Sequence, residues 1–154
     1  MKVEGKAAEI IQFLFGRGAS TVTDIARQTS STYAHTVRTI NRLAKEGLVK
    51  SERRGRTKLV ELTEVGKRIG EQLDHIESLM ELARLGTEVE TLYEREVKGR
   101  LREEVNQQRV LEVLGQISKK LEPLESKKVT MELALKLRSK VEELEREVRG
   151  LVLG

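Results

Sequence analysis

Apolar residues recur at helical spacing in the first part of the chain. In residues 6–15 the spacing of Ala, Ile and Leu predicts an amphipathic helix, and the glycines that follow it predict its end. A short second helix is predicted within residues 20–29, where Thr21 or Thr23 has the side chain of an N-cap. These two elements predict the start of a compact helical domain.

A third helix is predicted between Ser30 and Gly47, with its N-cap at Ser30 or Ser31 and its end at the glycine. Its apolar residues recur at spacings of three and four, which predicts one buried stripe. The predicted stripe comprises Tyr33, Val37, Ile40, Leu43 and Ala44. The opposite face carries hydrogen-bond donors and small side chains, namely Thr32, His35, Arg38, Thr39 and Arg42. Such side chains suit base edges and phosphates.

Alternating apolar and polar residues in 48–52 and 58–62 predict two half-buried strands. The intervening RRGRT holds a glycine at the turn, so we expect a β-hairpin with cations at its tip. The order helix, short helix, turn, helix, hairpin is that of a winged helix-turn-helix domain, in which the hairpin is the wing. Cations on a wing can reach a phosphate backbone or a narrow minor groove, where the negative potential is strongest.

The rest of the chain carries longer helical patterns. A helix is predicted from Glu64 to Leu85, and Gly86 is expected to break it. Another helix is predicted from Thr87 to Leu121. Pro123 then interrupts the pattern, so we expect a bend or a hairpin loop there, with Pro123 placed to begin the last helix.

The last predicted helix has the most regular apolar stripe, and Lys, Glu and Arg flank it. Its spacings of four and three are typical of a coiled-coil seam, and a narrow stripe must pack on a partner helix. The partner is the preceding helix or a second copy, and we expect both in a dimer built as a helical bundle or an antiparallel coiled coil. The residues expected at the dimer contact are Leu133, Leu137, Val141, Leu144, Val148 and Leu151.

Charge divides the chain into two parts. Residues 1–72 hold fourteen Lys and Arg against eight Asp and Glu, a net charge of +6, whereas residues 73–154 carry a net charge of −2. A basic domain attracts polyanions through its electric field and through counterion release. We therefore expect a winged helix DNA-binding domain in residues 1–72, a helical dimerisation region in residues 73–154, and double-stranded DNA as the partner.

Composition argues against catalysis, cofactors and membrane insertion. The chain has no Cys, and His35 and His75 are too few for a recognisable metal site. Asp occurs only at Asp24 and Asp74, without a His or Ser arranged as in a catalytic triad, and FGRGAS lacks the Lys-Ser/Thr of a nucleotide-binding loop. No apolar run is long enough to cross a bilayer. We expect a cytoplasmic protein that is not an enzyme and needs no cofactor.

The sequence from Thr23 to Ile69 resembles the winged-helix part of MarR- and PadR-type transcriptional regulators. The resemblance rests on DIA in the second predicted helix, RLAKEGLV at the end of the third, and LTEVGKRI after the wing. It implies Thr63 as the N-cap of the next helix, the third helix in the major groove, and the wing on the backbone or in the minor groove. The residues expected to contact DNA are Ser31, Thr32, His35, Thr36, Arg38, Thr39, Arg42, Arg53, Arg54, Arg56 and Lys58.

The resemblance favours a dimeric, sequence-specific transcription regulator. MarR-type proteins usually have an extra N-terminal helix in the dimer contact, which is not predicted here, so dimerisation is expected to rest on the C-terminal helices. Two alternatives stay open: an architectural protein that coats DNA, and a protein-docking module whose coiled coil binds the partner. The resembled families also bind small-molecule effectors, but no cluster of aromatic and polar residues marks such a pocket in this sequence. The operator, and the choice between pairing within one chain and exchange between chains, stay open as well.

Overall fold

The computed structural model describes residues 5–153, and the side chains of residues 5–150. It divides into two compact units, Met1–Asp74 and His75–Gly154. The predicted fold class is confirmed, because helices dominate the described residues and a small antiparallel sheet belongs to the first unit. No helix in this part of the chain combines the length and the hydrophobicity that crossing a membrane requires.

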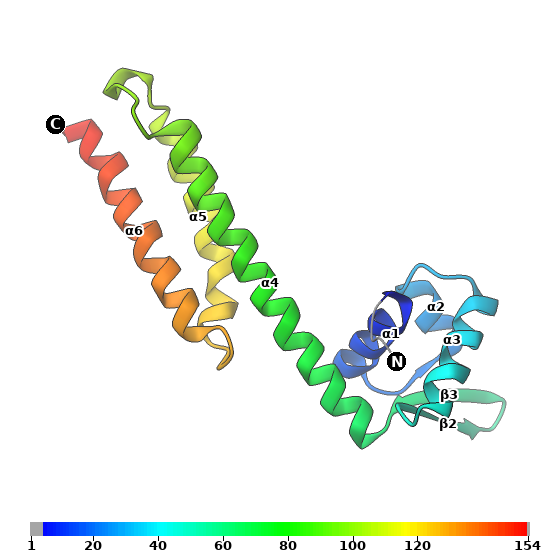
Figure 1. Ribbon diagram of the computed structural model, residues 1–154. Coiled ribbons are helices and arrows are strands. Elements are labelled where there is room, and N and C mark those ends of the chain that lie inside the picture. The colour runs from blue at the N-terminus through cyan, green and yellow to red at the C-terminus, as the bar shows by residue number, and fades with distance from the viewer. Residues whose placement is uncertain (1–4, 154) are drawn as a thin grey trace. The chain divides into compact units, whose positions relative to one another are not determined.

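The first unit combines short helices with a small sheet. Its elements are α1 (Gly5–Arg17), β1 (Ser20–Thr21), α2 (Val22–Gln28), α3 (Tyr33–Lys45), β2 (Val49–Arg54) and β3 (Thr57–Leu62) (Figure 1). The described strands pair antiparallel in the order β1-β3-β2. The core joins the inner faces of the helices to the sheet, and its fully buried members include Ile11, Ile25, Leu43 and Val60.

Threonine caps set the start of α2 and α3. Thr21 is the N-cap of α2, as predicted, because its hydroxyl accepts a hydrogen bond from the backbone N–H three residues on, at 3.2 Å. The N-cap of α3 is Thr32, which accepts the equivalent bond at 3.1 Å. The prediction of Ser30 or Ser31 is therefore wrong. Ser30 has a left-handed backbone (φ 51°), which keeps the chain out of the helix at that point.

The buried stripe of α3 differs from the predicted one. It comprises Thr36, Thr39, Ile40 and Leu43. Tyr33 and Ala44 are exposed, so placing them in the core is wrong. The hydroxyls of Thr36 and Thr39 donate to carbonyls one helical turn earlier, at 2.7 and 3.0 Å. These bonds satisfy the hydroxyl groups, which allows the two threonines to be buried.

One continuous helix, α4 (Glu64–Glu96), follows the wing. Thr63 caps it, as the resemblance implied, since its hydroxyl accepts a hydrogen bond from the N–H of Gly66 at 3.1 Å. The prediction that Gly86 breaks this helix is wrong. One glycine costs about 1 kcal/mol in a helix interior, and burial of Leu85 and Val89 beside it outweighs that cost.

The first turn of α4 lies close to the start of the wing. A Cβ on Gly66 would lie 2.1 Å from the carbonyl oxygen of Leu48, so no larger residue fits there without a backbone shift. The hydroxyl of Thr63 also donates to the carbonyl of Gly47 at 2.7 Å. These contacts fix the base of β2 against α4.

The predicted helix from Thr87 to Leu121 is interrupted between α4 and α5 (Gln107–Glu125). Gly99 has the left-handed backbone (φ 70°) that is common where helices end, and the short 3-10 helix η1 (Arg102–Glu104) follows. Asn106 then caps α5 by accepting a hydrogen bond from a backbone N–H at 3.2 Å. The prediction of one helix is wrong because these end signals override the apolar spacing.

The connection from α5 to α6 (Met131–Leu153) begins after Pro123. Since α5 continues for two residues beyond it, the prediction that Pro123 begins the last helix is wrong. Pro123 has no N–H to donate to the carbonyl four residues earlier, so α5 lacks that hydrogen bond, and burial of Leu124 offsets part of this loss. The hydroxyl of Thr130 donates to the carbonyl of Leu124 at 2.7 Å and orders the connection.

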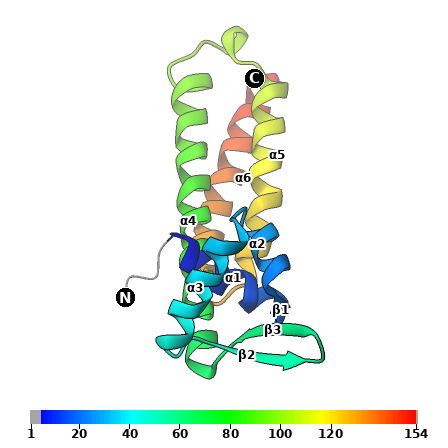
Figure 2. The same cartoon turned by 90° about the vertical axis from the view of Figure 1, so that its right-hand side faces the viewer.

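In the second unit, the later part of α4 lies beside α5 and α6, and the three share one core (Figure 2). The α6 residues in that core are Ala134, Leu137, Val141, Leu144 and Val148. Leu133 is 51% exposed and does not belong to it. The side chain of Leu151 lies outside the described residues. Four of the residues expected at a dimer contact are thus buried within one chain.

An ion pair of limited exposure joins α5 to α6. The guanidinium of Arg138 donates to the carboxylate of Glu125, at 3.0 Å from Nε, and to the backbone carbonyl of Ser118 at 2.9 Å. The hydrogen bond to Glu125 raises the pKa of Arg138 above its usual value. The two helices are therefore paired within the chain by polar as well as apolar contacts.

Candidate nucleic-acid interface

The outer face of α3 is polar and lies away from the core. Its exposed side chains include Ala34, His35, Arg38, Asn41, Arg42 and Lys45. Arg38, Asn41 and Lys45 follow one another at spacings of three and four residues, so they lie on the same side of the helix. Among the described residues, Arg38, Arg42 and Lys45 have no ion-pair partner, and their charges are available to a polyanion.

The predicted contact residues near the start of α3 divide into exposed and buried ones. Thr32 and His35 are exposed, and Ser31 is half-buried in the turn before the helix. Thr36 and Thr39 are buried, and their hydroxyls already bond within the helix. We therefore leave Thr36 and Thr39 out of the contact set that we propose below.

Sequence reasoning missed Asn41 and Lys45 on this face. It chose the outer face from polar residue types, and the two buried threonines shifted that face around the helix. The sequence did contain a signal for these two residues. Ile40 and Leu43 mark the inner side of the helix, and Asn41 and Lys45 lie across the helix from that side. An Asn on such a face can form two hydrogen bonds with adenine.

The wing is a tight hairpin. Arg54 pairs with Thr57, which leaves Gly55 and Arg56 as the two loop residues. Gly55 occupies the first loop position with φ 63°, the backbone that a type II′ turn requires there. The turn therefore places Arg56 at the tip, and residues 50–58 are all exposed.

The cations of the wing differ in whether they have partners. Lys50 pairs with Glu61 and Arg54 with Glu52, each at 3.6 Å. Within residues 5–153, Arg53, Arg56 and Lys58 have no such partner. Arg53 and Lys58 face each other across the two strands, so their side chains leave the same face of the hairpin.

A hollow of about 360 Å³ lies between the wing and the helices of the first unit. Arg53, Arg56 and Lys58 line one side, and Thr23 at the start of α2 and Tyr33 at the start of α3 line the other. Tyr33 is 60% exposed and lines this hollow, so it does not belong to the core. The hollow has no acidic lining residue, so its chemistry suits a phosphate group.

A family comparison agrees with this geometry. Residues 3–66 match the family model of the winged helix DNA-binding domain. The match covers 64 of the 154 residues, so it is a likeness of the first unit and not of the whole chain. It agrees with the winged-helix fold that was predicted for this part of the chain.

Several solved structures are similar to parts of this chain. The AF1382 protein of Archaeoglobus fulgidus is 28% identical, with 49% of this chain and 87% of that protein covered and a TM-score of 0.46. A MarR family transcriptional regulator of Silicibacter pomeroyi DSS-3 is 23% identical, with 59% and 65% covered and a TM-score of 0.50. A ZitR variant of Lactococcus lactis is 22% identical, with 78% and 76% covered and a TM-score of 0.50.

The last two matches show a shared fold. This chain spans 52% of the NadR structure and 51% of an AbfR structure, about half of each. No curated relative matches the chain.

Proposed function

We propose that the protein is a transcription regulator that binds a specific double-stranded DNA site as a homodimer and needs no cofactor. The observation that carries this proposal is a set of exposed cations on the first unit that have no ion-pair partner within residues 5–153. The set comprises Arg38, Arg42, Lys45, Arg53, Arg56 and Lys58. Cations that are not neutralised within the protein can neutralise phosphates and release counterions.

The two parts of the surface have different tasks in this proposal. Arg38, Asn41 and Arg42 of α3 lie in the major groove, where guanidinium and amide groups distinguish base edges. Arg53 and Lys58 of the wing hold the phosphate backbone or the adjacent minor groove. The helix then supplies specificity, and the wing supplies affinity and position.

An apolar surface on the second unit supports the homodimer. Ile76, Leu79 and Met80 on α4 are 52%, 37% and 59% exposed, and Leu133 on α6 is 51% exposed. Leu79 and Leu133 line the same groove, of about 370 Å³, between these helices. A second copy that covers this surface would remove its apolar side chains from water. We propose this surface, rather than the buried stripe of α6, as the dimer contact.

Selection of bound duplexes from a random library, followed by footprinting, tests the DNA proposal. We expect a discrete protected site with two half-sites about 34–36 Å apart, or a whole multiple of that spacing. Arg38→Ala should weaken binding by about 1–3 kcal/mol and relax specificity at one position. Lys67→Ala, which removes an exposed cation paired with Glu64, is the matched control and should bind normally.

The same experiment separates the alternatives. Uniform protection along the duplex would favour the architectural protein over the regulator. No binding in dilute buffer would contradict the DNA proposal and favour a protein-docking module.

Sedimentation tests the dimer separately. Ile76→Asp with Met80→Asp should give a folded monomer, because a charge on a covered apolar surface is costly. Leu135→Asp, at a 49% exposed position of α6 that does not line the groove, is the control and should remain a dimer. A dimer that survives the α4 changes would show that another surface holds the two copies.

A further inference from the structure

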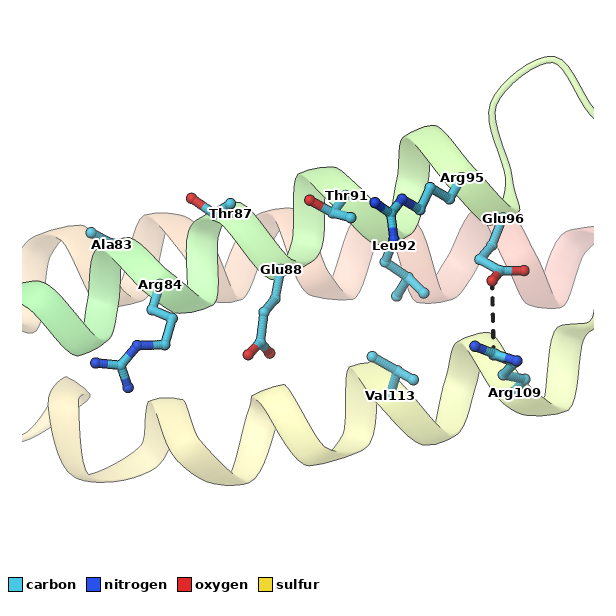
Figure 3. A pocket seen from close by; sticks show the side chains of 10 residues that line it. All are labelled: Ala83, Arg84, Thr87, Glu88, Thr91, Leu92, Arg95, Glu96, Arg109 and Val113. Carbon is cyan, nitrogen blue, oxygen red and sulfur yellow. Dashed lines mark ion pairs between the residues drawn. The ribbon is translucent and has the colours of Figure 1, made fainter.

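A second hollow, of about 560 Å³, lies within the second unit between α4 and α5 (Figure 3). Ala83 and Leu92 of α4 and Val113 of α5 give it an apolar floor, and Thr87 and Thr91 add hydroxyl groups. The volume falls within the range of about 300–1,000 Å³ that is common for small-molecule sites, as does the mixture of apolar surface with a few polar groups.

Three of the charged residues along this hollow, Arg84, Glu96 and Arg109, already have partners. Arg84 pairs with Glu81, one turn earlier on α4. Arg109 of α5 pairs with Glu96 of α4 at 3.8 Å, and this pair closes one end of the hollow (Figure 3). These pairs leave little net charge for a ligand to neutralise at those positions.

Glu88 and Arg95 also line the hollow, but they differ from these paired residues. Among the described residues, neither side chain has an ion pair or a hydrogen bond. They lie seven residues apart on the same side of α4, so their backbone positions are two helical turns or about 10 Å apart along the helix. In Figure 3 the carboxylate of Glu88 points toward α5, and Arg95 lies back along α4 toward Thr91 and Leu92. An unpaired anion and an unpaired cation therefore border one apolar floor.

We propose that this hollow binds a small apolar molecule that carries an ammonium group at one end and a carboxylate at the other. The ammonium pairs with Glu88, the carboxylate pairs with Arg95 and the hydroxyl of Thr91, and the apolar body covers Leu92 and Val113. A short apolar peptide with free ends and an ω-amino acid share this chemistry. A simple monoanion or monocation satisfies only one of the two charges.

This site shares only Ala83 with the groove of the surface proposed for the second copy. The exposed apolar residues Ile76 and Met80 do not line it, and the groove that Leu133 borders is on the α6 side of α4. The inference also does not depend on DNA binding, because it concerns side chains of the second unit alone.

Calorimetric titration of the full chain with two probes, trileucine and 8-aminooctanoate, tests the proposal. We expect at least one probe to bind with a Kd below about 1 mM. N-acetylation of that probe should weaken binding about tenfold in the unaltered protein, and so should amidation of its carboxylate. Binding of trileucine alone would identify a peptide site, and binding of 8-aminooctanoate alone an ω-amino acid site.

Variants of Glu88 and Arg95 test which residue binds each end of the ligand. Glu88→Gln should bind the N-acetylated and free probes equally, Arg95→Gln should bind the amidated and free probes equally, and Arg95→Lys should retain most of the affinity. Glu147→Gln and Arg146→Gln, at exposed positions of α6, are the matched controls and should bind like the unaltered protein. Absence of binding by both probes would overturn the proposal. So would binding that ignores both variants, or binding that is lost at concentrations where the chain is a dimer.

Discussion

The two units of this protein differ in how their unpaired cations are grouped. Both units hold ion pairs between side chains, as in Lys50–Glu61 and Arg54–Glu52 of the first unit and Arg109–Glu96 and Arg138–Glu125 of the second. In the first unit, the cations of α3 and three cations of the wing have no partner among the described residues. In the first unit these unpaired cations gather on one helix face and one hairpin, and such a surface suits a polyanionic partner.

The cores of the two units also differ. The first unit buries threonines beside its apolar residues. Caps and turns make up much of its sequence, and they position α3 and the wing. The second unit buries a long seam of Leu, Val and Ile shared by α4, α5 and α6. A change in the second unit should therefore act mainly on stability and assembly, and a change on the first unit's surface mainly on binding.

The largest effect that separates the units should come from Leu114→Ala. Leu114 is fully buried in the seam of the second unit, so the cavity and the lost burial should cost about 2–5 kcal/mol. We expect the melting temperature of the helical unit to fall substantially, while the melting temperature of the winged helix domain stays the same. Leu135→Ala, at an exposed position, should change neither. A joint shift of both transitions by Leu114→Ala would contradict the independence of the two cores.

The wing offers a matched test of paired and unpaired cations. Arg53→Gln with Lys58→Gln removes two cations without partners, whereas Lys50→Gln with Arg54→Gln removes two that are ion-paired. The first variant should weaken DNA binding about twentyfold. It should also reduce the steepness of the slope of log K against log salt by about two per protomer. The second should do much less. Equal losses, measured by fluorescence anisotropy at several salt concentrations, would show that partners within the wing do not matter.

Stability of the helical unit should depend on one ion pair more than on the others. Glu125→Gln should cost about 1–2 kcal/mol, because it leaves the partly buried guanidinium of Arg138 with a weaker partner. Glu143→Gln on the exposed side of α6 should be close to neutral. Chemical denaturation of the full chain measures both, and a neutral result for Glu125→Gln would place this pair with ordinary surface pairs.

The smallest effect should come from the cap of α3. Thr32→Ala removes the acceptor for the first turn and should cost about 0.5–1 kcal/mol of winged helix stability. Ser31→Ala, one residue earlier, should leave stability unchanged because it is not the cap. Thermal denaturation that ranks the two variants in the reverse order would show that the helix starts earlier than described.

Much of the winged helix domain could be predicted because its signals are local. Gly47 and Gly55 mark a helix end and a turn, Thr21 marks a helix start, and alternating residues mark the strands. The errors come from residue type. Thr36 and Thr39 were predicted to lie on the surface because they are polar, but their hydroxyls form hydrogen bonds within α3. The predicted outer face was therefore rotated around the helix, and it included these two threonines in place of Asn41 and Lys45.

The helical unit was harder to predict because the same residue types serve several structures. Gly86 lies in the middle of a helix, whereas Gly99 ends one, and only the buried seam and the following cap at Asn106 separate the two cases. On α6, the small Ala134 is buried and the large Leu133 is exposed, which reverses the order that hydrophobicity alone predicts. The pairing of α6 with α5 depends on contacts between residues that are distant in sequence.

The salt dependence of DNA binding by the unaltered chain tests the central claim most directly. The six cations of α3 and the wing that have no ion-pair partner among the described residues should give log K against log salt a slope of about −5 for a monomer and about −10 for a dimer on its site. Affinity that is lost steeply between dilute and physiological salt, with such a slope, is the predicted result. A slope near zero, or no binding to duplex DNA in dilute buffer, would contradict the account.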